Sequence, residues 1–205
     1  MRLLLLRHAE TILNQEHRVQ GLSQSDLTPL GQDQACALAE ALKEERLDAI
    51  YSSPLARALQ TARAIAAARG IAVQEVDPLK EANAGEMEGL LASELSALYP
   101  KFMARWPVDA TAAMPGGESL QQVQDRVWPF LGGLPERHQD QTIAVFTHNF
   151  VIQVVIAKML GMPTVAALKL RIGLASISEV EWSNSRWTLV RLSDSCHLDT
   201  LSSLA

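Results

Sequence analysis

Short apolar runs alternate with amphipathic stretches along most of the chain. The runs at residues 1–6 and 142–147 are nearly continuous, as in strands that are buried on both faces. Further strands are predicted at residues 47–52 and 71–76. Apolar positions at helical spacing predict helices over residues 28–45, 53–69, 94–106, 118–131 and 149–160. Strands that alternate with helices predict an α/β fold with helices on both faces of the sheet.

Capping residues indicate where several helices begin and end. Thr28 precedes Pro29, and Ser53 precedes Pro54. A capping hydroxyl followed by proline is a common start of a helix. Gly70 is a typical helix stop. We therefore expect Thr28 and Ser53 to be N-cap residues.

The remaining segments suggest how one domain is completed. Residues 11–30 are polar and turn-rich, which predicts a loop over the edge of the sheet. Residues 175–182 and 187–192 alternate apolar and polar positions, which predicts a hairpin at a sheet edge that could pair across a homodimer. Residues 83–117 are the best candidate for an inserted cap or lid. Without repeats or a linker, we expect residues 1–205 to form a single domain.

Composition narrows the class of partner. The chain is 48% hydrophobic and 20% charged, as in an ordinary globular protein. Its net charge of −5 argues against nucleic-acid binding but allows a small anionic substrate held by a few local arginines. Cys36 and Cys196 lie in no metal-ligand spacing. With neither a signal-peptide core nor a membrane span, we expect a cytoplasmic protein that does not contact a membrane.

Charged side chains follow the predicted strands where each of them ends. Arg7 and His8 follow the first strand, Arg57 the second, Glu81 the third and His148 the fourth. In open α/β sheets, ligands bind beyond the carboxyl ends of the strands. Two arginines, two histidines and a carboxyl group at one edge would suit a tetrahedral phosphate, because guanidinium groups bind phosphate oxygens in pairs.

This set of residues predicts covalent phosphoryl transfer. Nearby Arg7 and Arg57 should depress the pKa of His8, so that the imidazole is neutral and can attack phosphorus. Glu81 could protonate the leaving oxygen and then act as a base on water. A relay through His8 splits one difficult displacement into two easier ones.

Several motifs, in the same order along the chain, resemble the histidine phosphatase family, the superfamily of cofactor-dependent phosphoglycerate mutases and related phosphatases. They are Leu6-Arg7-His8-Ala9-Glu10-Thr11 with Asn14, Arg18-Val19-Gln20-Gly21 with Asp26-Leu27-Thr28, Ser52-Ser53-Pro54-Leu55-Ala56-Arg57 with Ala58-Leu59-Gln60-Thr61-Ala62, Glu81 with Gly85, Glu88 and Gly89, Pro115-Gly116-Gly117-Glu118-Ser119, and Thr147-His148. The resemblance implies a three-layer α/β/α sandwich around a mostly parallel mixed sheet, as in phosphoglycerate mutase.

The resemblance also implies roles for individual residues. His8 would be the phosphorylated nucleophile and Glu81 the proton donor. The transferring group would be held by substrate-binding residues, which are Arg7, Asn14, Gln20, Gly21, Arg57, His148 and Asn149. No metal and no cofactor are implied. We expect hydrolysis of a small phosphorylated metabolite such as phosphoserine, alpha-ribazole phosphate, a phosphoglycerate or a sugar phosphate.

Two departures from the family pattern affect this expectation. The usual glycine after the nucleophile is Ala9, which disfavours a positive φ at that position. The mutase branch carries Glu-Arg-His-Tyr-Gly at the proton-donor segment, whereas residues 81–85 read Glu-Ala-Asn-Ala-Gly. The chain also lacks the longer insertion of mutases. These features favour a phosphatase, with a cofactor-dependent phosphoglycerate mutase as the alternative.

Two other classes of function remain open from the residues alone. A metallohydrolase could use His8, Glu10, Glu81 and His148 as ligands, although arginines nearby oppose a cation. A catalytically silent module could bind a phosphorylated ligand without turning it over. Loss of activity on chelation would favour the first, and absence of any turnover the second.

Overall fold

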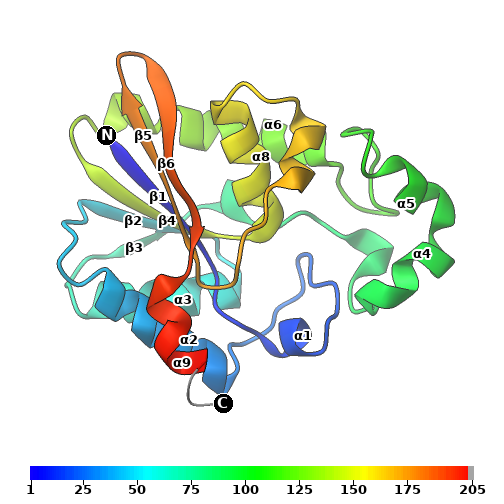
Figure 1. The fold of residues 1–205 in the computed structure, drawn as a ribbon, viewed down its shortest axis with the longest axis horizontal. Helices are drawn as coiled ribbons and strands as arrows, with labels where there is room; N and C mark the ends of the chain where they lie inside the picture. Colours follow the sequence, from blue (N-terminus) through cyan, green and yellow to red (C-terminus); the bar gives the residue numbers. More distant parts are fainter. Residues whose placement is uncertain (203–205) are drawn as a thin grey trace.

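The computed structural model describes residues 1–202, and within them six strands form one mixed sheet in the order β3-β2-β4-β1-β5-β6 (Figure 1). The strands are β1 (Arg2–Arg7), β2 (Ala49–Ser52), β3 (Val73–Glu75), β4 (Thr142–Thr147), β5 (Ile177–Ser183) and β6 (Arg186–Asp194). The first four are parallel, β5 runs antiparallel to β1, and β6 runs antiparallel to β5. The predicted, mostly parallel mixed sheet is therefore confirmed.

Side chains of the central strands alternate between two buried cores. Leu3 and Leu5 of β1 face a core shared with α6 (Leu120–Gly132) and α8 (Asn149–Met159). Leu4 and Leu6 face the opposite core, shared with α2 (Pro29–Ala41) and α3 (Ala56–Ala67). All four leucines are fully buried. The two helical layers confirm the predicted three-layer α/β/α sandwich.

The two predicted helix caps have different outcomes. Thr28 is the N-cap of α2, and its hydroxyl accepts a hydrogen bond of 3.0 Å from the Gly31 N–H. The prediction for Ser53 is wrong, because α3 begins only at Ala56 and its N-cap is Leu55. The hydroxyl of Ser53 is instead bonded to a histidine of the site described below.

Predicted boundaries differ from the structure where turns interrupt the chain. The expected loop at residues 11–30 contains a short helix, α1 (Ile12–Gln15), which Thr11 caps. The helix expected over residues 94–106 is broken into α4 (Leu95–Leu98) and α5 (Pro100–Arg105). Pro100 cannot donate the hydrogen bond that would continue the first helix. The expected helix at 28–45 ends at Ala41, and the strand at 71–76 shortens to β3.

The segment between β3 and α6 carries short elements only. In Figure 1, α4 and α5 lie to one side of the sheet, beyond α8. That this segment acts as a cap or lid stays a prediction. The same segment also contains η1 (Asp77–Leu79), η2 (Gly85–Met87) and η3 (Ala92–Glu94). Four further short elements follow α6, namely α7 (Leu134–Arg137), η4 (Thr164–Lys169), η5 (Cys196–Leu198) and α9 (Asp199–Ser202).

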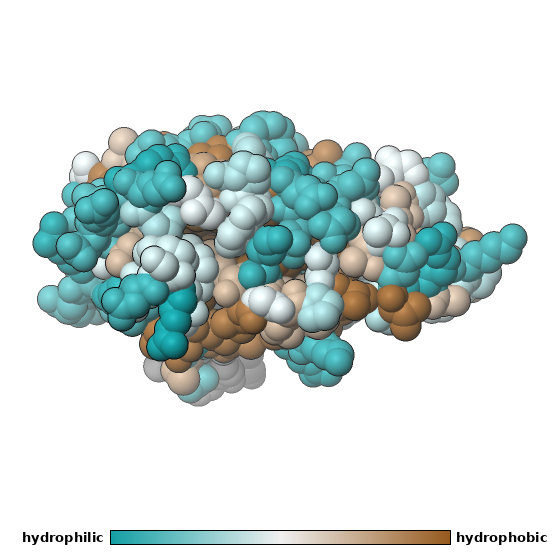
Figure 2. All heavy atoms as spheres, turned by 90° about the horizontal axis from the view of Figure 1, so that it is seen from above, coloured by the Kyte–Doolittle hydropathy of each residue, from teal (hydrophilic) through white to brown (hydrophobic). Residues whose placement is uncertain are grey.

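The surface seen in Figure 2 is mainly hydrophilic, with hydrophobic side chains gathered along one border. Burial of the leucines and valines of the strands leaves mostly polar side chains for the exterior. In the part of the chain that the structure describes, no helix is long and apolar enough to cross a membrane.

Candidate active site

The carboxyl end of β1 and the first turns of α3 and α8 border a cavity of about 190 Å³. Eight of the nine predicted site residues line this cavity, namely Arg7, His8, Asn14, Gln20, Gly21, Arg57, Glu81 and Asn149. The ninth, His148, is fully buried and is not among the lining residues, but its ring centroid lies 5.2 Å from that of the lining residue His8. A larger open groove of about 610 Å³ beside β3 has only Arg63 and Glu75 as charged lining residues. The convergent polar groups are in the smaller cavity.

His8 is held in one tautomer at the end of β1. Its Nδ1 lies 2.8 Å from the carbonyl oxygen of Ala9. Since a carbonyl only accepts, Nδ1 carries the hydrogen and Nε2 keeps its lone pair. Burial, and then the charges of Arg57 and Arg7, hold the pKa of His8 well below its ordinary value. The side chain is therefore a neutral imidazole with a nucleophilic Nε2.

Ala9 fits the position that a glycine usually takes in relatives. It is not among the non-glycine residues with positive φ. Its N–H donates to Thr61 Oγ1 at 3.1 Å, and the residue is fully buried in a small apolar cluster with Leu27, Ala35 and Ala175. The departure from glycine is accommodated without an unusual backbone at this residue.

Arg7 and Arg57 place two guanidinium groups against the cavity. Arg57 is fully buried and donates from Nη1 to Ser23 O at 2.9 Å and from Nη2 to Gly21 O at 2.8 Å. Arg7 donates from Nη1 to Ile172 O at 2.6 Å. The Nε atoms of both are buried and have no partner among the described residues. Burial lowers the pKa of Arg57 to about 10, so it stays charged at neutral pH.

The loop that accepts from Arg57 is fixed by Glu88. The Glu88 carboxylate accepts from the Leu22 N–H at 2.6 Å and from the Ser23 hydroxyl. Gly21 has φ +54°, and a Cβ there would lie 2.2 Å from Glu88 Oε1. The positive φ favours glycine at this turn, and a side chain there would also displace the Glu88 carboxylate. In the same loop, the amide oxygen of Gln20 is buried at the cavity and has no partner within residues 1–202.

Glu81 is a buried carboxyl group whose pKa is raised. It is 8% exposed, and desolvation raises its pKa against the opposing effects of N–H donors and of Arg57 and Arg7. The donors are the N–H of Ala82, at 2.9 Å, and that of Phe150 in the first turn of α8, at 3.2 and 3.3 Å from the two oxygens. A raised pKa favours the protonated form that a general acid needs.

Ser53 sets the hydrogen bonding of His148, a role that differs from the helix cap predicted for it. His148 is fully buried, and its Nε2 lies 2.8 Å from Ser53 Oγ. That hydroxyl also accepts from the Leu55 N–H at 3.3 Å. If it donates its own proton to Nε2, then Nδ1, which has no partner among the described residues, carries a hydrogen for an anion. Burial, Arg57 and His8 lower the pKa of His148.

Polar groups at the rim complete the cavity. The amide oxygen of Asn14 accepts from the N–H of Thr11 at 3.2 Å and from its hydroxyl at 2.9 Å, and neither contact uses the amide N–H groups. Arg18 also lines the cavity and donates to Gly89 O at 2.7 Å. We did not assign Arg18 to the site from the sequence, although it belongs to the same motif as Gln20.

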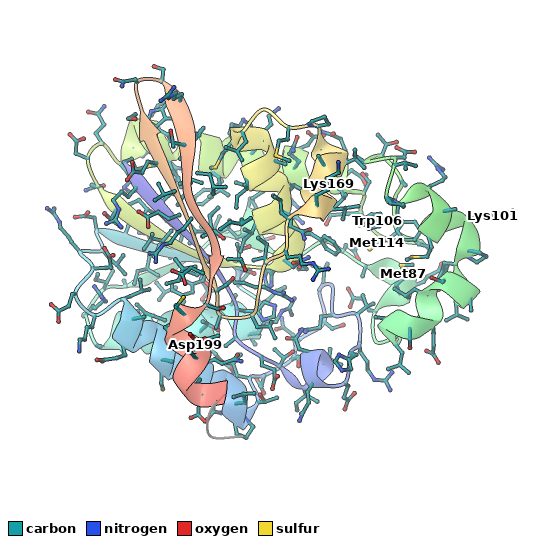
Figure 3. All side chains as sticks on the ribbon, viewed as in Figure 1. Met87, Lys101, Trp106, Met114, Lys169 and Asp199 are labelled. Carbon is teal, nitrogen blue, oxygen red and sulfur yellow. The ribbon has the colours of Figure 1, made fainter. Side chains whose placement is uncertain are left out.

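The segment at residues 83–117 contributes apolar lining. Figure 3 shows Met87, Trp106 and Met114 on the side of α5 that faces the rest of the molecule, whereas Lys101 lies on the outer side. Met114 lines the cavity, and Met87 is 1% exposed within the core. Trp106 packs edge-on against Phe150 at 5.7 Å. Met87 therefore belongs to the core, and Trp106 is partly buried against it.

Comparison with known proteins identifies the family. The model of the histidine phosphatase superfamily (branch 1) matches residues 3–195. The chain belongs to the histidine phosphatase superfamily. This histidine phosphatase is 36% identical to phosphoserine phosphatase 1 of Hydrogenobacter thermophilus over 199 residues, which cover 97% of this chain and 94% of that protein. It is 33% identical to a probable phosphoglycerate mutase of Salmonella typhi over 203 residues, covering 96% and 94%.

A solved structure extends the likeness to three dimensions. The mycobacterial glucosyl-3-phosphoglycerate phosphatase complexed with VO3 superposes with a TM-score of 0.88 and 32% identity, over 95% of this chain and 99% of that chain. The predicted fold of a phosphoglycerate mutase-like protein is confirmed. As a histidine phosphatase, the protein is a phosphoric monoester hydrolase, as the sequence predicted.

Proposed function

We propose that the protein hydrolyses a small-molecule phosphomonoester without a metal ion, through a phosphohistidine intermediate on His8. The observation that carries this proposal is the environment of His8. Its Nδ1 is occupied by Ala9 O, its Nε2 is an unprotonated nucleophile, and the ring lines a cavity with two buried guanidinium groups. Buried arginines with unpartnered N–H groups are a strong anion site.

In the first step, His8 Nε2 attacks phosphorus and the bond from phosphorus to the ester oxygen breaks. Glu81 gives its proton to the departing oxygen, so that an alcohol leaves. Arg7, Arg57 and the Nδ1–H of His148 bind the three oxygens that stay on phosphorus. These donors are fixed before the reaction, so that charge that develops on those oxygens is met without reorganisation.

In the second step, water attacks the phosphoryl group and the bond from nitrogen to phosphorus breaks. The Glu81 carboxylate, left ionised by the first step, takes a proton from the water. Phosphate leaves, and His8 and Glu81 return to their starting protonation states. Asn14, Gln20, Gly21 and Asn149 also line the cavity and would border the substrate.

The candidate substrates remain phosphoserine, alpha-ribazole phosphate, phosphoglycerates and sugar phosphates. The cavity of about 190 Å³ suits a phosphoryl group with a small organic part. A panel of these esters, assayed without added metal, should rank them by kcat/KM. Location in the cytoplasm and assembly into a homodimer stay predictions.

Substitution of the nucleophile tests the proposal. His8→Ala should abolish turnover of p-nitrophenyl phosphate, whereas incubation of the wild type with a chelator should leave its rate unchanged. His17→Ala, at an exposed histidine outside the cavity, is the matched control. Retention of most activity in His8→Ala would end the proposal, and loss on chelation would favour a metallohydrolase.

The second candidate is a cofactor-dependent phosphoglycerate mutase, which the 33% identity to a probable mutase supports. Isomerisation of a phosphoglycerate, stimulated by a catalytic amount of bisphosphate and faster than release of phosphate, would establish it. Residues 81–85 read Glu-Ala-Asn-Ala-Gly instead of the mutase pattern, which favours hydrolysis.

A further inference from the structure

Arg126 holds the backbone of the segment that carries Glu81. It belongs to α6 and is not among the residues that line the cavity. Its Nη1 donates to Pro78 O at 2.7 Å and to Lys80 O at 2.9 Å, and its Nη2 donates to Glu81 O at 3.2 Å. One side chain therefore fixes three carbonyl groups, the last of them that of Glu81 itself.

Glu118 completes this arrangement on the other side of Glu81. Both carboxylate oxygens of Glu118 accept from Arg126 at 2.9 Å, and Oε2 also accepts from the Asn83 N–H at 2.9 Å. The Glu118 N–H donates to Asn83 O at 2.8 Å. Burial would raise the pKa of the Glu118 carboxyl, but Arg126 and the Asn83 N–H hold it below its ordinary value. The pair is thus ionised, bidentate and bonded to the chain before and after Glu81.

The carboxyl of Glu81 is held separately, by the N–H groups of Ala82 and Phe150. Its position depends on both supports, because the side chain can meet those donors only if its own backbone is in place. A general acid must lie within about 2.6–3.2 Å of the oxygen that it protonates. A displacement of about 1 Å caused by a distant change can cost roughly 100-fold in rate.

We propose that Arg126 and Glu118 form a brace that positions Glu81 for proton transfer, so that Arg126 determines how well the enzyme expels leaving groups that need a proton. This inference rests on the proposed function, in which Glu81 is the proton donor. Arg126 acts through the backbone, since it donates to the carbonyl of Glu81 and not to its carboxyl. It is a positioning residue and does not contact the substrate.

Two substrates separate this role from a general structural one. The leaving group of phosphoserine is an alkoxide, which requires protonation. The leaving group of p-nitrophenyl phosphate is a stabilised phenolate, which does not. The ratio kcat/KM reports only steps up to departure of the alcohol, so hydrolysis of the phosphohistidine does not enter. Both are therefore compared by kcat/KM in the full-length protein.

Arg126→Met should lower kcat/KM for phosphoserine by roughly 10-fold to 100-fold and that for p-nitrophenyl phosphate by less than about threefold. Arg126→Lys keeps donors for the carbonyl groups and should recover part of the loss. The matched control is Arg69→Met, since Arg69 also donates to two backbone carbonyls, Leu42 O and Glu45 O, away from the cavity. Arg69→Met should leave kcat/KM unchanged for both substrates.

Equal losses for the two substrates, or no loss for either, would overturn the brace. If Arg126→Met does not fold, Arg126→Lys and Glu118→Gln provide the same comparison and should show the same selective loss. Glu81→Gln separates the two proposals. If Glu81→Gln lowers kcat/KM equally for the two esters, Glu81 is not the proton donor and the proposed function is wrong on this point. If Glu81→Gln shows the selective loss for phosphoserine but the Arg126 variants do not, only the brace is refuted.

Discussion

Removal of the Arg57 guanidinium should strongly weaken binding of the phosphoryl group in the transition state and therefore lower kcat/KM. Arginine has five N–H donors. Two of them are used on the carbonyls of Gly21 and Ser23, which leaves three for the substrate, including the buried Nε–H that has no partner among the described residues. Because a guanidinium group binds phosphate through two parallel hydrogen bonds, we count two of the three remaining donors as bonded to phosphoryl oxygens.

Charge-assisted hydrogen bonds contribute about 1.5–3 kcal/mol each. Loss of two raises the barrier by about 3–6 kcal/mol, or lowers kcat/KM by roughly 10²–10⁴. Arg57→Met should show this loss with p-nitrophenyl phosphate, and weaker inhibition by inorganic phosphate in the same assay. Arg57→Lys has only three donors; two of them would hold the carbonyls, so about one bond is lost and kcat/KM falls roughly 10–100-fold.

The control is Arg63→Met, which removes an exposed arginine from the same helix. Thermal unfolding of both variants checks that they are folded, since Arg57→Met leaves two carbonyl groups without their donor. A kcat/KM within about threefold of the wild type in folded Arg57→Met, with unchanged phosphate inhibition, would refute the assignment of Arg57 to the phosphoryl site.

Four further predictions concern pH, metal and packing. Because the pKa of Glu81 is raised, its protonated form persists to higher pH than for an ordinary glutamate; kcat/KM for phosphoserine should fall as pH rises through that pKa, and Glu81→Gln should abolish this limb of the profile. Because the pKa of His8 is lowered, the nucleophile should stay neutral as pH falls below the ordinary histidine value, and an acidic limb near that ordinary value would contradict this. Dialysis against a chelator should leave kcat unchanged, and restoration by added Zn²⁺ or Mg²⁺ would argue for a metal. Phe146→Ala, at a fully buried position in β4, should lower the free energy of unfolding by about 3–5 kcal/mol in urea titrations, and a change below about 1 kcal/mol would contradict the packing.

The sheet and its two helical layers follow from the hydrophobic pattern. Continuous apolar runs predicted β1 and β4 closely, because strands that are buried on both faces are apolar over most of their length. The helix ends were predictable where one capping side chain decides them, as at Thr28. They were not predictable at Ser53, where a histidine almost a hundred residues later binds the hydroxyl. Local sequence carries no signal for a partner so distant.

The site was predictable because its residues follow strand ends, which share one edge of the sheet. His8 follows β1 and Arg57 lies in the first turn of α3, after β2, and the two still meet at one cavity. Less of the surrounding support could be foreseen. The contacts of Arg126 reach back 45 to 48 residues, to backbone carbonyls that have no sequence signature. Glu118 was predicted only to lie at the start of a helix. Its hydrogen bond to Asn83 shows that it also holds the loop that follows Glu81.

The break in the helix expected over residues 94–106 has a visible cause. Pro100 lies in the middle of that range, and the preceding Tyr99 has φ −128° and ψ 54°. Periodicity alone favoured one continuous helix, but the missing N–H of proline prevented it. The short helix α1 was not predicted, because four residues are too few to show a helical period.

The central claim is that a phosphoryl group is transferred to the imidazole of His8. The direct test mixes enzyme with a phosphate ester, stops turnover with denaturant at high pH, and locates the added phosphoryl group by mass spectrometry of peptides. We expect a base-stable, acid-labile phosphoryl group on His8, formed at least as fast as steady-state turnover and absent from His8→Ala. A phosphoryl group on another residue, or active enzyme with no phosphorylated peptide under conditions that preserve phosphohistidine, would contradict it.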